Sequence, residues 1–109
     1  MTRPLESEIR ELHAQICQAL ADPTRIMLLY SLVDSPQNVG ELAVELKLSQ
    51  PNVSRHLKVL RERGMVNAAR EGANVVYSLA DKRVIKALDL MREVLGDHLA
   101  QRAQLAKAL

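Results

Sequence analysis

The sequence predicts a single domain that is mainly α with a small β-hairpin (α+β). Apolar residues recur with the helical period of about 3.6 over most of the chain. Between Gly64 and Asp81 the period falls to two, which is the period of a strand. The length of 109 residues allows one domain, and no Gly/Ser-rich linker divides it. We therefore expect residues 1–109 to form one folded unit.

Two helices are predicted before residue 36. The first, over residues 5–21, has an apolar stripe at helical spacing, made of Leu5, Ile9, Leu12 and Ile16. Asp22 has the chemistry of an N-cap, and Pro23 suits the first turn of a second helix. The inward face of that helix is predicted to consist of Ile26, Leu29, Tyr30 and Val33. Asp34-Ser35-Pro36 then ends it.

Two further helices are predicted, separated by a tight connection. Residues 39–47 form the third helix, with one apolar face of Val39, Leu42, Ala43 and Leu46. After Leu48, Ser49 is a good N-cap, and Pro51 is tolerated in a first turn. The fourth helix is expected to run to about Arg63 and to stop at Gly64.

A β-hairpin and a long helix complete the chain. Val75, Tyr77 and Leu79 alternate with residues of the opposite face, and residues 65–70 are short and tolerate a strand. Residues 71–73 would form the turn. The helical pattern resumes at Asp81 and is expected to continue to the end of the chain, with Gly96 as a weak point costing about 1 kcal/mol.

The last helix is apolar over an unusually wide arc, because a second stripe of Ala87, Leu90 and Val94 lies beside the first. Four short helices and a hairpin supply too little surface to cover it. We expect a homodimer that joins residues 81–109 to residues 1–21. Its predicted interface consists of Leu5, Ile9, Leu12, Ile16, Leu88, Met91, Leu95 and Leu99. The alternative is that the last helix covers the core of its own chain.

The order helix, turn, helix, hairpin is that of a winged helix-turn-helix, with residues 38–63 as the helix-turn-helix and residues 65–80 as the wing. Amides and hydroxyls suit base edges, and cations suit phosphates. The predicted DNA-binding residues are Ser49, Gln50, Asn52, Ser54, Arg55, His56, Lys58, Arg70 and Asn74. Taken singly, each residue has an alternative role. The polar side chains could be helix caps, the basic side chains could form a solvated helix face, and His56 could be a structural histidine.

The charge distribution supports this interpretation. Residues 47–83 carry eight Lys or Arg and three acidic residues, 8 − 3 = +5, so the rest of the chain carries 2 − 5 = −3. A basic centre between acidic ends is typical of a nucleic-acid surface, and on charge alone a solvated charge cluster is the alternative. Aromatic residues make up only 2% of the chain, which argues against stacking on single strands and favours duplex DNA.

Four segments of the chain resemble the ArsR–SmtB family of bacterial repressors: ADPTR at 21–25, VGELA at 39–43, SQPNVSRHL at 49–57 and LRERGMV at 60–66. The resemblance extends over about residues 10–95. It implies a homodimeric winged-helix repressor of its own operon, joined by its first and last helices. It also implies an imperfect palindromic operator and release by an inducer. Activation in place of repression stays open.

The resemblance also implies effector sites, but this chain lacks their ligands. A thiolate site on the third helix would need cysteines near Asn38 and Gly40, and one on the fourth helix would need them at Val59 and Arg63. A site on the last helix would need imidazoles at Arg83 and Val94, and only its Asp81 is present. A redox sensor would need a cysteine near Tyr30. No cofactor is predicted, and the effector is unknown.

A remaining metal or haem site is conceivable from His13, Cys17 and His98, if the first and last helices meet across the dimer. Two other readings of the same residues stay open. Cys17 could be a redox switch. Alternatively, Cys17 could be a small buried hydrophobe, with both histidines on the surface.

No phosphate loop, HExxH pair or serine elbow is present, so an enzyme is not expected. The apolar run from Ile26 to Tyr30 is far shorter than the roughly 20 residues of a membrane helix. Residues 1–15 are too charged for a secretory segment, and the single cysteine suits a reducing compartment. We therefore expect a cytoplasmic protein without a membrane partner. The alternative function is a protein-interaction module that uses the apolar last helix, with weak or vestigial DNA binding.

Overall fold

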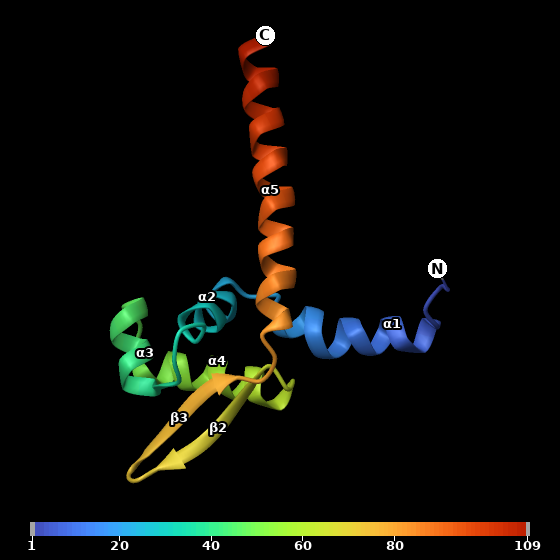
Figure 1. The fold of residues 1–109 in the computed structure, drawn as a ribbon. Helices are drawn as coiled ribbons and strands as arrows, with labels where there is room; N and C mark the ends of the chain where they lie inside the picture. The colour runs from blue at the N-terminus through green and yellow to red at the C-terminus, as the bar shows by residue number, and fades with distance from the viewer. Residues whose placement is uncertain (1, 109) are drawn as a thin grey trace.

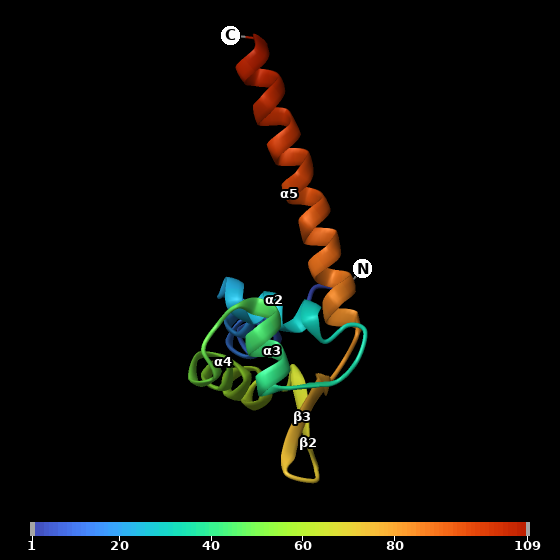
Figure 2. The same cartoon turned by 90° about the vertical axis from the view of Figure 1, so that its left-hand side faces the viewer.

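A computed structural model describes residues 2–108, and it confirms the mainly α fold with a small sheet. The elements are α1 (Glu6–Leu12), a π-helical turn η1 (His13–Cys17), α2 (Pro23–Ser31), β1 (Gln37–Asn38), α3 (Val39–Leu46), α4 (Gln50–Glu62), β2 (Val66–Glu71), β3 (Asn74–Leu79) and α5 (Arg83–Ala108). Helices α2, α3 and α4 and the sheet form what we call the body. Helices α1 and α5 project from the body in different directions (Figures 1 and 2).

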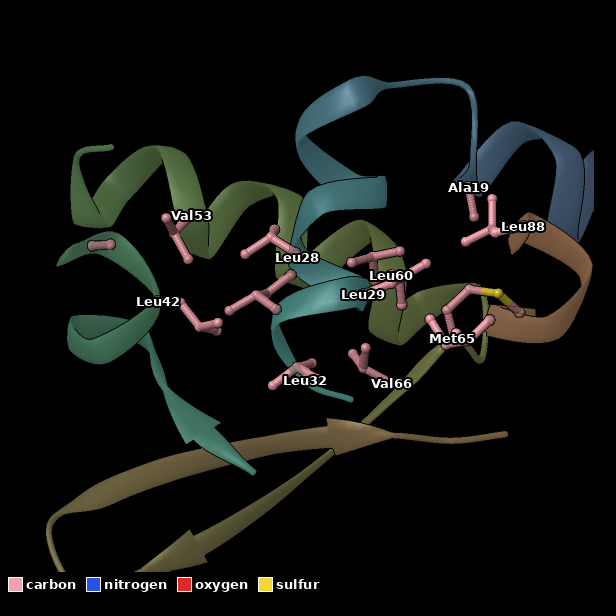
Figure 3. Close-up of a cluster of buried hydrophobic side chains, with 13 residues drawn as sticks. Ala19, Leu28, Leu29, Leu32, Leu42, Val53, Leu60, Met65, Val66 and Leu88 are labelled. Atoms are coloured by element: carbon pink, nitrogen blue, oxygen red, sulfur yellow. The ribbon is translucent and has the colours of Figure 1, made fainter. Parts of the chain in front are cut away.

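The core of the body is aliphatic and lies between α2, α3 and α4 (Figure 3). The predicted inward faces of α3 and α4 are confirmed: Leu42, Val53, Leu57 and Leu60 are all fully buried. They meet Leu28 and Leu29 of α2. Burying one such side chain contributes about 1.5–3 kcal/mol, so this cluster holds α4 in a fixed orientation.

The inward face of α2 differs from the prediction at its end. Leu32 is buried, whereas Val33, which we expected to point inward, is 39% exposed. The reason is that α2 ends at Ser31, and its C-cap Leu32 has left the helical region with φ −91° and ψ 0°. Position 33 therefore no longer follows the helical period.

The sheet has three strands rather than the two of the predicted hairpin. Its order is β1-β3-β2, and both pairings are antiparallel. Gln37 pairs with Tyr77 and Asn38 with Val76. A strand of two residues carries no alternation that the sequence could reveal. Its position is set by contacts such as the 2.6 Å hydrogen bond from the Gln37 amide to the carbonyl of Ser31.

Glycine is needed at both ends of β2. Gly64 has φ +76° directly after α4, and the N–H of Met65 reaches back to the carbonyl of Leu60 at 2.8 Å, which closes the helix. Gly72 has φ +62° in the two-residue turn between Glu71 and Asn74. A positive φ at the first turn position matches the twist of the two strands, so the wing is a tight hairpin.

The first helix is not uniform. It is α-helical over Glu6–Leu12 and becomes π-helical over His13–Cys17. Helix α5, in contrast, runs without a break through Gly96 to Ala108. Within residues 2–108, no helix is both long enough and apolar enough to cross a membrane.

Candidate nucleic-acid interface

Helix α4 is built so that one of its sides must face solvent. The hydroxyl of Ser49 accepts a hydrogen bond from the N–H of Asn52 at 3.2 Å, and Pro51 occupies the first turn. Val53, Leu57 and Leu60 attach the opposite side to the core. Because these anchors are completely buried, core packing fixes the rotation of the helix about its axis and leaves its other side facing outward.

The outward side of α4 carries the predicted DNA-binding groups. Gln50, Ser54, Arg55 and Lys58 are exposed, whereas Asn52 is half-buried. The side-chain oxygen of Asn52 accepts a hydrogen bond from the Arg55 guanidinium at 2.9 Å. Asn52 therefore orients Arg55, while the other donors of this guanidinium stay available for a phosphate or a guanine edge.

The wing lies beside the start of α4. Arg70 and Asn74 are exposed near its tip. A groove of about 580 Å³ separates the wing from the helices, and it is bordered by Gln50, Ser54 and Tyr77, among other residues. Both α4 and the wing lie at the end of the molecule opposite the C-terminus of α5 (Figures 1 and 2). Helix and wing thus border one groove at the same end of the molecule.

His56 is the predicted DNA-binding residue whose placement differs most from the others. It is half-buried, and its Nδ1 lies 3.4 Å from a guanidinium nitrogen of Arg25. The same guanidinium donates to the carbonyls of Ala19 at 2.7 Å and Gln18 at 3.0 Å. This placement favours the structural role that the sequence left open. Through Arg25, His56 connects α4 to the end of the first helix.

Asp22 begins α2 as predicted, since its carboxylate accepts from the N–H of Thr24 at 2.8 Å and of Arg25 at 3.3 Å. Burial would raise the pKa of Asp22. The two backbone hydrogen bonds and the charges of His56 and Arg25 outweigh it, so the pKa lies below its usual value.

Asp22→Ala should therefore lower the free energy of unfolding by about 1 kcal/mol at neutral pH, the usual cost of a lost N-cap. A lowered native pKa means that this contribution is present above the pKa of the unfolded chain, about 3.9, and is lost as the pH falls through the native pKa. Urea unfolding at pH 7 and pH 3 measures both values. The difference from wild type should shrink at pH 3, and a constant difference would contradict the assignment. Asp34→Ala is the control, because Asp34 is exposed.

Two arginines hold the first helix in a way that sequence reasoning missed. Besides Arg25, the half-buried Arg63 donates a hydrogen bond to the carbonyl of Ala14. From the sequence, Arg63 is expected only near the end of the fourth helix, without a contact to the first helix. No periodic pattern could have revealed these contacts, because their partners are backbone carbonyls of a distant segment.

The positions at which the family resemblance would place metal ligands or a redox cysteine make other contacts here. Asn38 caps α3, with its side-chain oxygen 2.8 Å from the N–H of Glu41. Arg83 pairs with Asp81 at 2.7 Å and, with its own backbone N–H, lowers the pKa of that carboxyl to about 2. Arg63 binds Ala14, and Tyr30 donates to Asp89 at 2.6 Å. These residues do not fit a metal site.

The three remaining candidates are not brought together within one protomer. His13 and Cys17 lie on η1, and His98 lies on α5, all three exposed. Cys17 is thus not the buried hydrophobe of one alternative. The nearest polar contact of His13 is the Gln18 amide, 3.5 Å from its Nε2. In the part of the chain that the structure covers, no group of three His, Cys, Asp or Glu could hold a metal ion.

Most of the predicted dimer residues are exposed in the protomer. Relative exposures range from 45% to 73% for Leu5, Ile9, Leu12, Met91, Leu95 and Leu99. Two members of the predicted set are less exposed. Leu88 is 5% exposed and belongs to the core, and Ile16 is half-buried against that core. Figure 3 shows Leu88 beside Ala19, at the start of α5.

Comparison with known proteins assigns this arrangement to a family. A family model described as "Bacterial regulatory protein, arsR family" matches residues 22–68. The HTH-type transcriptional regulator CmtR of Mycobacterium tuberculosis is 45% identical over 94 residues, which cover 84% of this chain and 80% of CmtR. The transcriptional repressor SmtB homolog of Synechocystis is 42% identical over 88 residues, covering 81% of this chain and 64% of that protein.

A solved structure extends the likeness to the whole fold. The homodimeric winged helix-turn-helix DNA-binding domain Mb0332 of Mycobacterium bovis matches with a TM-score of 0.75 at 26% identity. The match covers 91% of this chain and 94% of that one. With CmtR at 45% identity over most of both chains, the relationship goes beyond a shared architecture. The chain belongs to the arsR family of bacterial regulatory proteins.

Proposed function

We propose that this protein is a homodimeric, sequence-specific regulator that binds duplex operator DNA in the cytoplasm and represses its own operon until an effector releases it. One observation carries the proposal: the exposed outer side of α4, with Gln50, Ser54, Arg55 and Lys58, borders the same groove as the wing. Helix α4 would lie in the major groove, and the wing would rest on the adjacent backbone or minor groove.

The exposed apolar residues of α1 and α5 support the dimer. Leu95 and Leu99 remain about half exposed, at 52% and 51%, on a helix that leaves the body. A second copy would cover them and would place two α4 helices in successive major grooves, roughly 34 Å apart. Such a dimer matches an imperfect palindrome. Any ligand that prefers a different separation of the two helices lowers DNA affinity by linkage.

Two substitutions test the DNA-binding surface, using duplexes that the wild-type protein selects from a random library. Arg55→Ala should weaken binding by about 1–3 kcal/mol if Arg55 contacts a base. Arg70→Ala should weaken binding to all sequences and reduce the log–log salt slope by about one unit, because one phosphate contact is lost. Fluorescence anisotropy at several salt concentrations measures both values.

The control for these variants is Arg3→Ala, which removes an exposed arginine from the segment before α1, outside both the DNA-binding surface and the apolar stripes. It should leave affinity and salt slope at wild-type values. All variants should remain dimers in sedimentation experiments. If neither Arg55→Ala nor Arg70→Ala changes binding, this surface is not the DNA interface.

A further inference from the structure

Helix α5 is attached to the body over a short length only. Within Arg83–Ala108, Ile85 and Leu88 are the buried residues, and every residue from Asp89 onward is exposed. Figures 1 and 2 show the helix leaving the body at this point. Beyond Asp89 it continues for about 30 Å. A small rotation at its base therefore becomes a large displacement at its far end.

One polar cluster connects α5 to the body just after the last buried residue. The hydroxyl of Tyr30, on α2, donates to Oδ1 of Asp89 at 2.6 Å. Arg92 donates to the same oxygen at 3.2 Å, and its guanidinium carbon lies 5.2 Å from the centre of the Tyr30 ring. Burial and the hydrogen bond to Asp89 raise the pKa of Tyr30, so its hydroxyl keeps the proton that it donates.

Side-chain packing within the protomer does not hold α5 at this level. Next to the cluster, η1, α2 and α5 enclose an apolar hollow of about 380 Å³, lined by residues that include Cys17, Leu20, Met91 and Leu95. Beyond Leu88, the Tyr30–Asp89–Arg92 cluster joins α5 to α2 beside this hollow, so it is placed to oppose rotation of α5 about Leu88. The cluster is largely exposed, with Asp89 at 51% and Arg92 at 69%, so it adds little to stability. The cluster therefore acts on the orientation of α5 relative to the body.

We infer that Tyr30 and Asp89 are positioning residues for operator binding, because they set the angle between α5 and the body. The inference rests on the proposed function, in which α5 joins two protomers. Tyr30 is on α2, which shares its core with α4: Leu28 and Leu29 pack against Leu57 and Leu60. The angle at Tyr30 therefore determines how far apart the two α4 helices of a dimer lie, and hence which half-site spacing the dimer accepts.

The test measures the dependence of affinity on half-site spacing. The probes are a duplex selected by the wild-type protein, the same duplex with one base pair added or removed at its centre, and a single half-site. Wild type should lose about tenfold in affinity when the spacing changes. Tyr30→Phe removes only the hydroxyl. When the spacing changes, this variant should lose less than about threefold in affinity. Its dimerisation, melting temperature and half-site affinity should be unchanged.

Two further variants make the result specific. Asp89→Asn keeps an oxygen that can accept a hydrogen bond from Tyr30 but loses the charge that attracts Arg92. Its loss of affinity on changed spacing should therefore lie between those of wild type and Tyr30→Phe. Arg83→Gln is the matched control. It removes an exposed ion pair at the base of α5, with Asp81 at 2.7 Å, that does not involve Tyr30. This control should discriminate as wild type does.

The outcomes separate this inference from the proposed function. If Tyr30→Phe and Asp89→Asn keep the wild-type spacing preference, the cluster does not position α5 and the inference is wrong. If the wild-type protein selects no duplex sequence from the library, the proposed function fails, and the inference fails with it. A relaxed spacing preference in Tyr30→Phe and, to a smaller degree, in Asp89→Asn, with Arg83→Gln unchanged, supports both.

Discussion

Replacing Leu95 by glutamate is expected to separate the dimer into folded monomers and to weaken operator binding by at least about a hundredfold. Leu95 is 52% exposed on α5, so the protomer fold does not depend on it. In the proposed dimer the new carboxylate would be buried against apolar surface without a partner, at a cost of several kcal/mol. The loss in DNA binding is large because two linked half-site contacts gain about 10²–10⁴ in affinity over one.

Sedimentation velocity measures the oligomeric state, and titration of the selected duplex measures the affinity. The control is Gln104→Glu, which introduces the same charge on the same helix. Gln104 is nine residues from Leu95, about 2.5 turns, and so lies on the opposite side of α5. It should remain a dimer with wild-type affinity. A dimeric Leu95→Glu protein would show that the interface lies elsewhere.

Leu57→Ala is expected to lower the free energy of unfolding by about 2–5 kcal/mol, because it leaves a cavity under α4. Leu57 is fully buried between Val53 and Leu60 on the inner side of that helix. A domain of this size has a total stability of about 5–15 kcal/mol, so the loss is a large part of it. Operator binding should also weaken, because the cavity allows α4 to shift.

Urea unfolding at a fixed protomer concentration checks this value, since the stability of a dimer depends on concentration. Val44→Ala is the control, because Val44 is 81% exposed on α3 and should change the stability by less than about 0.5 kcal/mol. A Leu57→Ala protein as stable as Val44→Ala would mean that Leu57 is not part of a close-packed core.

The sequence predicted elements whose ends depend on local backbone chemistry. Asp22 begins α2, Ser49 begins α4, and Gly64 ends α4, as expected from their side chains and allowed φ values. The exposed side of α4 was predictable for a related reason. Once Val53 and Leu57 are assigned to the core, the helical period places Arg55 and Lys58 outside.

Contacts between distant segments could not be predicted in this way. Strand β1 exists because Gln37 and Asn38 meet the edge of β3, about forty positions later in the chain. His56 turns toward Arg25, and Tyr30 toward Asp89, because the packing of the helices brings these side chains within reach. The helical period placed Leu88 on the apolar stripe that we assigned to the dimer interface. Leu88 is nevertheless buried in the core, because it lies where α5 still contacts the body.

By itself, the sequence determined the fold class, the order of the five helices and the two wing strands, and which side of α4 faces solvent. Periodicity, caps and glycines act over a few residues, and they need no knowledge of the rest of the chain. Only the tertiary structure decided how α1 and α5 join the body, through Arg25, Arg63 and the Tyr30–Asp89–Arg92 cluster. Those contacts depend on the relative placement of whole helices, which packing of the aliphatic core determines and no local pattern records.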